Sequence, residues 1–211
     1  METDVFKYNK KSAIIKHDRM ANKKIKVGFD LDGVLLYNPA RVFRPITIAL
    51  KQLLPKKKND VVHFYYPKSN YEKLLWRIVH WSSLFVSEGV EDIKALVKDE
   101  KIEPYIITSR YDCLKDDFKR WLKKMDAHLI FVDTYHNAKD LQPHIFKEQK
   151  IKELGLDYFI EDNWDIVRHI NKNTKAKTLW ITNAFDKHIP YDLKFLSLSE
   201  ALAYLKKQVS S

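Results

Sequence analysis

The chain has 211 residues, of which 45% are hydrophobic and 31% charged, and its net charge is +10. These values are typical of a globular protein with a buried core, and they exclude a wholly disordered chain. No apolar stretch approaches the roughly 20 residues of a membrane-spanning helix, and the first residues lack the apolar core of a signal peptide. A single cysteine, Cys113, cannot form an internal disulfide, which fits a reducing compartment. We therefore predict a cytoplasmic protein that does not enter a membrane.

The excess of 38 basic over 28 acidic residues attracts anions such as phosphorylated metabolites and nucleic acids. The lysines are scattered along the chain, and the short clusters at residues 10–11, 23–24 and 56–58 do not form a nucleic-acid-binding motif. A small phosphorylated substrate is therefore the favoured partner, while nucleic acid stays open but is not favoured. The sequence makes no prediction about the oligomeric state.

Along the chain, the expected elements alternate between strands and helices. Residues 1–23 are polar and basic and predict an arm, whereas IKVGFDL (residues 25–31) predicts a first strand. Residues 38–88 are rich in proline and aromatic residues, and apolar residues at helical spacing predict a helix within 71–86. After Gly89 the pattern predicts helices at 90–100, 112–125, 144–155, 163–173 and 197–207, and strands at 104–109, 128–133, 157–162 and 176–182.

This alternation predicts an α/β fold with a doubly wound parallel sheet, because strands joined through helices form right-handed parallel crossovers. We divide the chain into a basic N-terminal arm, a core domain and a small helical cap inserted after the first strand. The arm is 1–23, the core is 24–37 together with 89–211, and the cap is 38–88. Aromatic residues of the cap, among them Tyr65 and Tyr66, either form the core of the cap or stack on a substrate ring.

Ligands of such sheets bind beyond the carboxyl ends of the strands. The predicted strands bring many polar residues to that edge: Asp30, Asp32, Thr108, Ser109, Arg110, Asp133, Thr134, Glu161 and Asp162, with Asp165 one turn later. Lys147, in the helix before the fourth of these strands, can reach the same edge. Clustered carboxylates repel one another unless a hard cation lies among them, and oxygen ligands suit Mg²⁺. With a hydroxyl and a lysine to bind phosphate, the set allows phosphoryl transfer through an aspartyl-phosphate.

Four segments resemble, in order, the motifs of the haloacid dehalogenase (HAD) superfamily of phosphatases. FDLDGVLL resembles motif I, YIITSR resembles motif II, and FKEQKIKELGLDYFIEDNWDIV resembles motifs III and IV. The resemblance implies a HAD-like fold and a Mg²⁺-dependent phosphomonoester hydrolase. The resemblance also explains the glycine at position 33, because glycine allows the tight turn that follows the nucleophile strand.

Carried over to this chain, the resemblance implies a role for each site residue. Asp30 would be the nucleophile and Asp32 the general acid and base. Thr108, Ser109 and Lys147 would bind the phosphoryl group, with Lys150 as the alternative lysine. Mg²⁺ would be held by Asp30, the backbone carbonyl of Asp32, and Asp162. Glu161 and Asp165 would act through water or behind the metal ligands.

The presence of Asp32 favours the members of this superfamily that hydrolyse phosphate esters over the dehalogenases. The chain looks most similar to the 5′-nucleotidase or 5′(3′)-deoxyribonucleotidase-like branch, which implies a nucleoside monophosphate or another small phosphorylated metabolite as substrate. Arg110 departs from that branch, where a smaller or apolar residue is expected. Two alternatives remain: a nucleic-acid end phosphatase, and a non-catalytic binding module on a HAD-like fold.

Other nucleotide and metal motifs are excluded. Four glycines, at 28, 33, 89 and 155, cannot form a dinucleotide-binding loop, and the P-loop lysine is missing after Gly33. The histidines and Cys113 lack zinc-ligand spacing.

Overall fold

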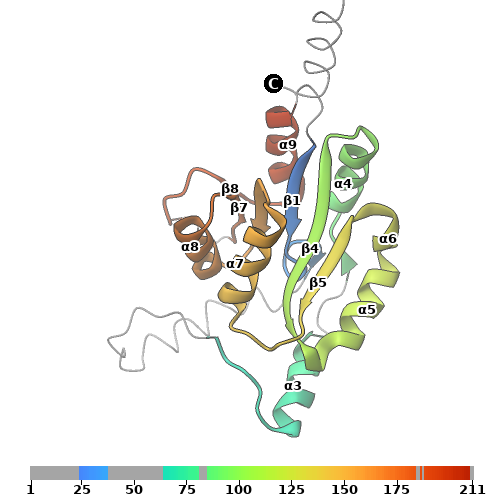
Figure 1. Ribbon diagram of the computed structural model, residues 1–211, viewed down its shortest axis with the longest axis vertical. Coiled ribbons are helices and arrows are strands. Elements are labelled where there is room, and N and C mark those ends of the chain that lie inside the picture. The colour runs from blue at the N-terminus through green and yellow to red at the C-terminus, as the bar shows by residue number, and fades with distance from the viewer. Residues whose placement is uncertain (1–23, 38–63, 81–84, 184–185, 187, 210–211) are drawn as a thin grey trace, which may run out of the picture.

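The computed structural model describes residues 24–37, 64–80, 85–183, 186 and 188–209. Its main feature is a six-stranded sheet in the order β5-β4-β1-β6-β7-β8, in which all neighbouring strands run parallel (Figure 1). The strands are β1 (Ile25–Phe29), β4 (Ile102–Tyr111), β5 (Asp133–Asn137), β6 (Tyr158–Glu161), β7 (Lys177–Ile181) and β8 (Lys194–Phe195). The predicted α/β fold with a parallel sheet is confirmed.

Helices cover both faces of this sheet (Figure 1). One face packs against α4 (Gly89–Lys98), α5 (Lys115–Lys124), α6 (Ala127–Ile130) and α9 (Leu198–Val209). The other face packs against α7 (Pro143–Leu154) and α8 (Trp164–Asn173). A short 3-10 helix, η1 (Asp112–Leu114), precedes α5, and α3 (Asn70–His80) lies past the carboxyl end of β4. Among the residues described, no helix combines the length and the apolar character needed to cross a lipid bilayer.

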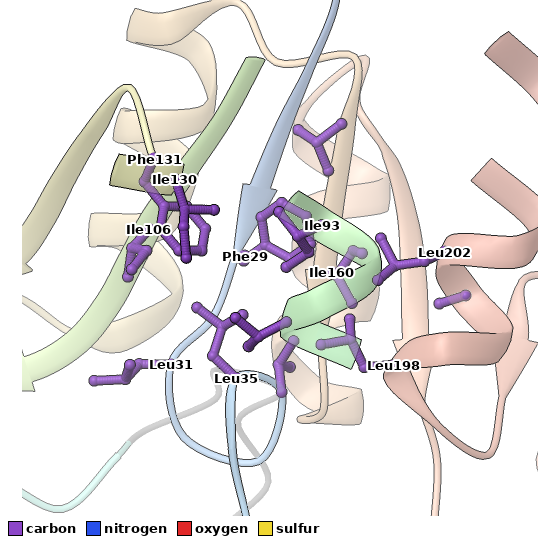
Figure 2. Packing of buried hydrophobic residues seen from close by; sticks show 14 of the residues in the cluster. Phe29, Leu31, Leu35, Ile93, Ile106, Ile130, Phe131, Ile160, Leu198 and Leu202 are labelled. Atoms are coloured by element: carbon purple, nitrogen blue, oxygen red, sulfur yellow. The ribbon is translucent and has the colours of Figure 1, made fainter. Parts of the chain in front are cut away.

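The two cores follow from the alternation of side chains along the strands. Phe29 and Ile160 enter the core beneath α4 and α9, where Figure 2 shows them beside Ile93 and Leu198. Phe159, next to Ile160, enters the opposite core beneath α7 and α8. Because central strands of a parallel sheet are buried on both faces, they read as nearly continuous apolar runs.

Gly28 leaves room beside β1 for the side chains of Leu156 and Phe159. A Cβ atom at this position would lie 2.5 Å from Cδ1 of Leu156 and 2.7 Å from Cδ2 of Phe159. Both distances are shorter than any ordinary contact between carbon atoms. The strand that leads to the acidic pair therefore needs a residue without a side chain here.

The strand expected at 128–133 is wrong. Residues Ala127–Ile130 form the short helix α6, and the strand β5 begins only at Asp133. Asp133 pairs with Tyr105 and Thr134 with Ile106, so both residues lie at the start of β5 and not at its carboxyl end. They are consequently not part of the polar edge at which the sequence placed them.

The helix expected within 71–86 is shorter than predicted. It ends at His80, and Phe85–Val86 forms strand β3, which pairs with β2 (Leu36–Tyr37) in a two-stranded antiparallel ribbon. The chain thus leaves the core and returns to it through adjacent strands. Most of the predicted cap (38–63 and 81–84) and the predicted arm (1–23) lie outside the described residues, so the domain boundaries stay a prediction.

Side chains at the helix starts show how the sequence sets these boundaries. Asn163 is the cap of α8, since its side-chain oxygen accepts the N–H of Asp165 at 3.0 Å. Ser197 caps α9 by accepting the N–H of Glu200 at 3.2 Å.

Candidate active site

Asp30 follows the last residue of β1, which lies between β4 and β6 in the sheet. Its side chain is buried, and its backbone N–H donates to the carbonyl of Ile160 at 3.0 Å. The chain then turns back, because the N–H groups of Leu35 and Leu36 both donate to the carbonyl of Leu31, at 3.1 and 2.8 Å. Gly33 sits in this turn with a φ of 84°, a conformation that glycine adopts at little cost.

Lys147, on α7, forms an ion pair with Asp30. Its Nζ lies 2.9 Å from Oδ1 of Asp30 and 2.6 Å from Oε2 of Glu161, and all three side chains are at most 7% exposed. Lys147 comes from the middle of α7 and Glu161 from the end of β6, the strand next to β1. One lysine and two acids are thus held together with little access to water.

Burial changes the protonation of this group. Burial raises the pKa of Asp30 to about 6, although Lys147 favours the carboxylate. Burial likewise raises the pKa of Glu161 to about 8 against the attraction of Lys147. For Lys147 burial opposes the charge, but the carboxylates of Asp30 and Glu161 outweigh it and raise the lysine pKa. Lys147 is therefore positively charged at neutral pH.

Asp162 completes an acidic cluster beside Asp30. Carboxylate oxygens of Asp30, Glu161 and Asp162 lie within 4.8 Å of one another, and all three residues are buried. Oxygen donors of this type suit a hard divalent cation such as Mg²⁺. The backbone of Asp162 is fixed from the sheet, since Nε1 of Trp180 donates to its carbonyl at 3.1 Å.

Both carboxylate oxygens of Glu161 accept hydrogen bonds. While Oε2 accepts from Lys147, its Oε1 accepts the backbone N–H groups of Asp162 and Asn163, at 3.0 and 2.9 Å. These bonds fix the loop that carries Asp162. Glu161 thus orients both Lys147 and Asp162.

Thr108 and Ser109 lie near the carboxyl end of β4, the strand next to β1. Thr108 is 1% exposed, and its Oγ1 accepts the backbone N–H of Arg110 at 3.3 Å. Oγ of Ser109 is buried and has no hydrogen-bond partner among the residues that the structure describes. A buried hydroxyl without a partner is costly, and a bound anion would satisfy it.

Asp32 lies beside Arg110, a partner that sequence reasoning missed. Nε of Arg110 donates to Oδ2 of Asp32 at 2.8 Å, and Nη2 donates to Oδ1 at 2.7 Å. The sequence placed Arg110 at the same polar edge and showed it as a departure from the family pattern, but did not pair it with Asp32. Its position two residues after Thr108 was the available signal, because it places the guanidinium on the strand next to Asp32.

Two other sequence candidates lie elsewhere. Lys150 pairs with the exposed Glu153 at 2.8 Å, so Lys147 and not Lys150 contacts Asp30. Asp165 pairs with Arg168 at 2.8 Å on the surface of α8, with 49% of its side chain exposed. The structure therefore brings together Asp30, Lys147, Glu161 and Asp162, and places Asp165 outside this group.

The segment that leads into α3 is hydrogen-bonded to the loops at the same edge. Tyr66 donates its hydroxyl to Oδ2 of Asp140 at 2.8 Å, and Tyr111 donates its hydroxyl to the carbonyl of Tyr65 at 3.1 Å. Asp140 has a left-handed φ of 51° and also accepts the N–H of Asp112 at 2.8 Å. Sequence reasoning singled out Tyr65 and Tyr66 but gave no signal for Asp140.

The fold is that of known hydrolases. No protein-family model matches the chain, and no curated protein matches its sequence. Among solved structures, the proposed HAD-hydrolase YfnB from Bacillus subtilis, bound to magnesium, superposes with a TM-score of 0.55, 13% identity, and coverage of 87% of this chain and 100% of that chain. A haloacid dehalogenase-like hydrolase from Xanthomonas campestris superposes with a TM-score of 0.52 and 12% identity, covering 90% of this chain and 99% of that chain.

A third structure is that of a mutant of CbbY from Rhodobacter sphaeroides in complex with xylulose-(1,5)bisphosphate. It superposes with a TM-score of 0.54 at 13% identity, covering 84% of this chain and 96% of that chain. At these identities the likeness establishes the fold alone. The chain has the fold of the HAD-superfamily hydrolases.

Proposed function

We propose that the chain is a cytoplasmic, Mg²⁺-dependent phosphomonoester hydrolase that acts through an aspartyl-phosphate on Asp30. The observation that carries this proposal is the buried contact of 2.9 Å between Asp30 and Lys147 at the end of the central strand β1. A nucleophile held beside a positive charge in a water-excluded site is suited to attack a phosphorus atom that carries negative oxygens. The HAD-like fold and the acidic cluster support the same reaction.

The residues present fit a magnesium ion. Asp30, Asp162 and the backbone carbonyl of Asp32 would hold it, while Glu161 would orient Lys147 and the Asp162 loop. Bound there, Mg²⁺ supplies positive charge to the phosphoryl oxygens. Thr108, Ser109 and Lys147 would bind those oxygens from the protein side.

The reaction proceeds in two steps. First, a carboxylate oxygen of Asp30 attacks phosphorus; the new O–P bond forms as the ester P–O bond breaks, and the leaving oxygen takes a proton from the carboxyl group of Asp32. Second, water attacks the phosphorus of the aspartyl-phosphate and gives a proton to Asp32. The bond between phosphorus and Asp30 then breaks, which releases phosphate and restores both aspartates.

The substrate is proposed to be a nucleoside monophosphate or another small phosphorylated metabolite. Tyr65 lies near the polar edge with 56% of its surface exposed, so an aromatic ring is available to a base. The CbbY mutant was crystallised with a sugar bisphosphate, so sugar phosphates belong among the candidates. An oligonucleotide with a terminal phosphate tests the nucleic-acid alternative, for which a net charge of +10 predicts steep salt dependence.

Phosphate release from this panel, with and without Mg²⁺, tests the proposal. We expect release by the wild type with Mg²⁺ and none by Asp30→Asn. Asp133→Asn is the matched control, because Asp133 is an exposed aspartate at the start of the edge strand β5. Equal rates for wild type and Asp30→Asn would refute the proposal. A non-catalytic module would also show no rise in melting temperature with Mg²⁺ and fluoroberyllate, a phosphate mimic.

A further inference from the structure

Arg110 is a charged side chain in an unusual position. Its side chain is 1% exposed, although arginine is almost never fully buried without partners. It lies near the end of β4, and its guanidinium contacts both oxygens of Asp32. Burial opposes its charge, but Asp32 and Asp117 outweigh that effect and raise the pKa of Arg110.

The other side of the guanidinium is held by α5. Nη1 of Arg110 donates to Oδ2 of Asp117, whose side chain is 9% exposed and also accepts from Arg120. Arg110 is therefore clamped between two carboxylates, one on the turn after β1 and one on a helix. Since a guanidinium is planar and rigid, two such contacts leave it one orientation.

The backbone at Arg110 is irregular. The ladder between β4 and β5 pairs Thr108 with His136 and then Tyr111 with Asn137, so that Ser109 and Arg110 are skipped. Extra residues of this kind in a strand redirect side chains and often lie next to active sites. The irregularity begins directly after Thr108, the residue proposed to bind the phosphoryl group.

From these contacts we propose that Arg110 is a positioning residue that fixes the carboxyl group of Asp32 for proton transfer to the leaving oxygen. This inference rests on the proposed function. Asp32 lies in the turn after β1, and its side chain is 23% exposed. The bidentate contact from β4 fixes the orientation of its carboxyl group, while each oxygen keeps a second lone pair for the proton.

The geometry predicts a specific kinetic pattern. A leaving oxygen of an alkyl ester needs a proton as the P–O bond breaks, whereas nitrophenolate leaves without one. Loss of the Arg110 contact should therefore slow an alkyl phosphate much more than p-nitrophenyl phosphate. It should lower kcat and leave KM nearly unchanged, because the buried guanidinium of Arg110 is occupied by Asp32 and Asp117.

The experiment compares wild type, Arg110→Lys, Asp32→Asn and the double variant on the best alkyl phosphate of the panel and on p-nitrophenyl phosphate. Lysine keeps the charge of Arg110 but cannot form the bidentate contact, so the fold is retained better than with alanine. The matched control is Arg168→Lys, since Arg168 is an exposed arginine that pairs with Asp165 on α8. Melting temperatures of all five proteins are measured in parallel.

We expect Arg110→Lys to lower kcat for the alkyl ester by about 100-fold and for the nitrophenyl ester by less than about 10-fold. In the Asp32→Asn protein the same substitution should cause no further loss, because Arg110 acts through Asp32. Equal losses for both esters, an effect on KM alone, or a further loss in the Asp32→Asn protein would overturn the proposal.

A wild type without Asp30-dependent phosphate release would instead overturn the proposed function. The melting temperatures would then still test whether Arg110 and Asp32 are coupled. If Arg110 holds Asp32, Arg110→Lys lowers the melting temperature more in the wild type than in the Asp32→Asn protein. Equal decreases would show that the two residues are not coupled.

Discussion

Replacing Lys147 by methionine would leave two buried carboxylates without a positive partner. Methionine has nearly the length of lysine, so the change removes the charge and the hydrogen bonds but little volume. Lys147 lies 2.9 Å from Asp30 and 2.6 Å from Glu161, and the two acids are 7% and 0% exposed. Breaking a buried ion pair on one side costs about 3–5 kcal/mol.

The size of the expected effect can be worked out from these values. In a chain of 211 residues, 1 kcal/mol lowers the melting temperature by about 2–4 °C, so the variant should melt about 6–20 °C below the wild type. Protonation offsets part of the loss, because burial already raises the pKa of Glu161 to about 8. The decrease at pH 7 should therefore lie toward the lower end of this range.

The pH dependence has a definite sign. A buried acid whose pKa is raised in the folded state binds its proton more tightly there than in the unfolded chain. Its stabilisation is present at low pH and is lost as the pH rises through the folded pKa, about 6 for Asp30 and about 8 for Glu161. Removing Lys147 strengthens this trend. The melting temperature of Lys147→Met should therefore lie closer to that of the wild type at pH 5 and further below it at pH 9.

Calorimetry of Lys147→Met and Lys150→Met measures this difference. Lys150 lies on the same helix and pairs with Glu153, an acid that is 59% exposed. An exposed pair contributes about 0–1 kcal/mol, so this control should melt close to the wild type. The reasoning would be refuted if both variants lost the same amount, or if Lys147→Met melted with the wild type at every pH.

Three further results are expected. Gly28→Ala should cost about 1–3 kcal/mol in urea unfolding, because its Cβ would meet Leu156 and Phe159 at 2.5 and 2.7 Å; an unchanged midpoint would contradict the packing. Glu72 caps the start of α3 by accepting the N–H of Ser69. This bond and the hydroxyl of Tyr65 lower the pKa of Glu72 to about 2. The stabilisation from this cap is therefore complete above about pH 4.5 and is lost as the pH falls through about 2. An NMR titration of the carboxyl carbon checks this, and a midpoint near 4.5 would disprove it. Mg²⁺ should raise the melting temperature of the wild type, and Asp162→Asn should weaken its binding by about 10-fold or more; equal shifts in both proteins would exclude Asp162 as a ligand.

The central strands could be predicted from the sequence because they are buried on both faces. Residues 25–29, 158–161 and 177–181 are short runs rich in apolar side chains, and each became a strand. The edge strand β5 could not be found in this way, since DTYHN is polar and has one neighbour. Two apolar residues precede β5: Ile130, the last residue of α6, and Phe131, which follows it. Both side chains lie in the core, and this apolar run led to the incorrect prediction of a strand at 128–133.

The acidic residues of the candidate site could be grouped from the sequence because neighbouring parallel strands end at one edge. Lys147 was preferred over Lys150 through the family resemblance alone, since the helical pattern does not separate them: each lies four residues from a buried apolar residue of α7, Ile151 and Phe146 respectively. The sequence placed Asp32 and Arg110 at the same polar edge, but it did not predict that they pair. The pairing depends on which strand lies beside β1 and on the skipped residues of β4, and a local sequence pattern shows neither.

The central claim is that Asp30 carries the phosphoryl group during turnover, and mapping the phosphorylated residue tests it most directly. The enzyme is mixed with Mg²⁺ and its best substrate, quenched in acid, digested and analysed by mass spectrometry. We predict one phosphoryl group on the peptide that contains Asp30, absent from Asp30→Asn and lost when the quenched wild type is treated with hydroxylamine. Phosphate release without this adduct, or with a phosphoryl group on another residue, would contradict the claim.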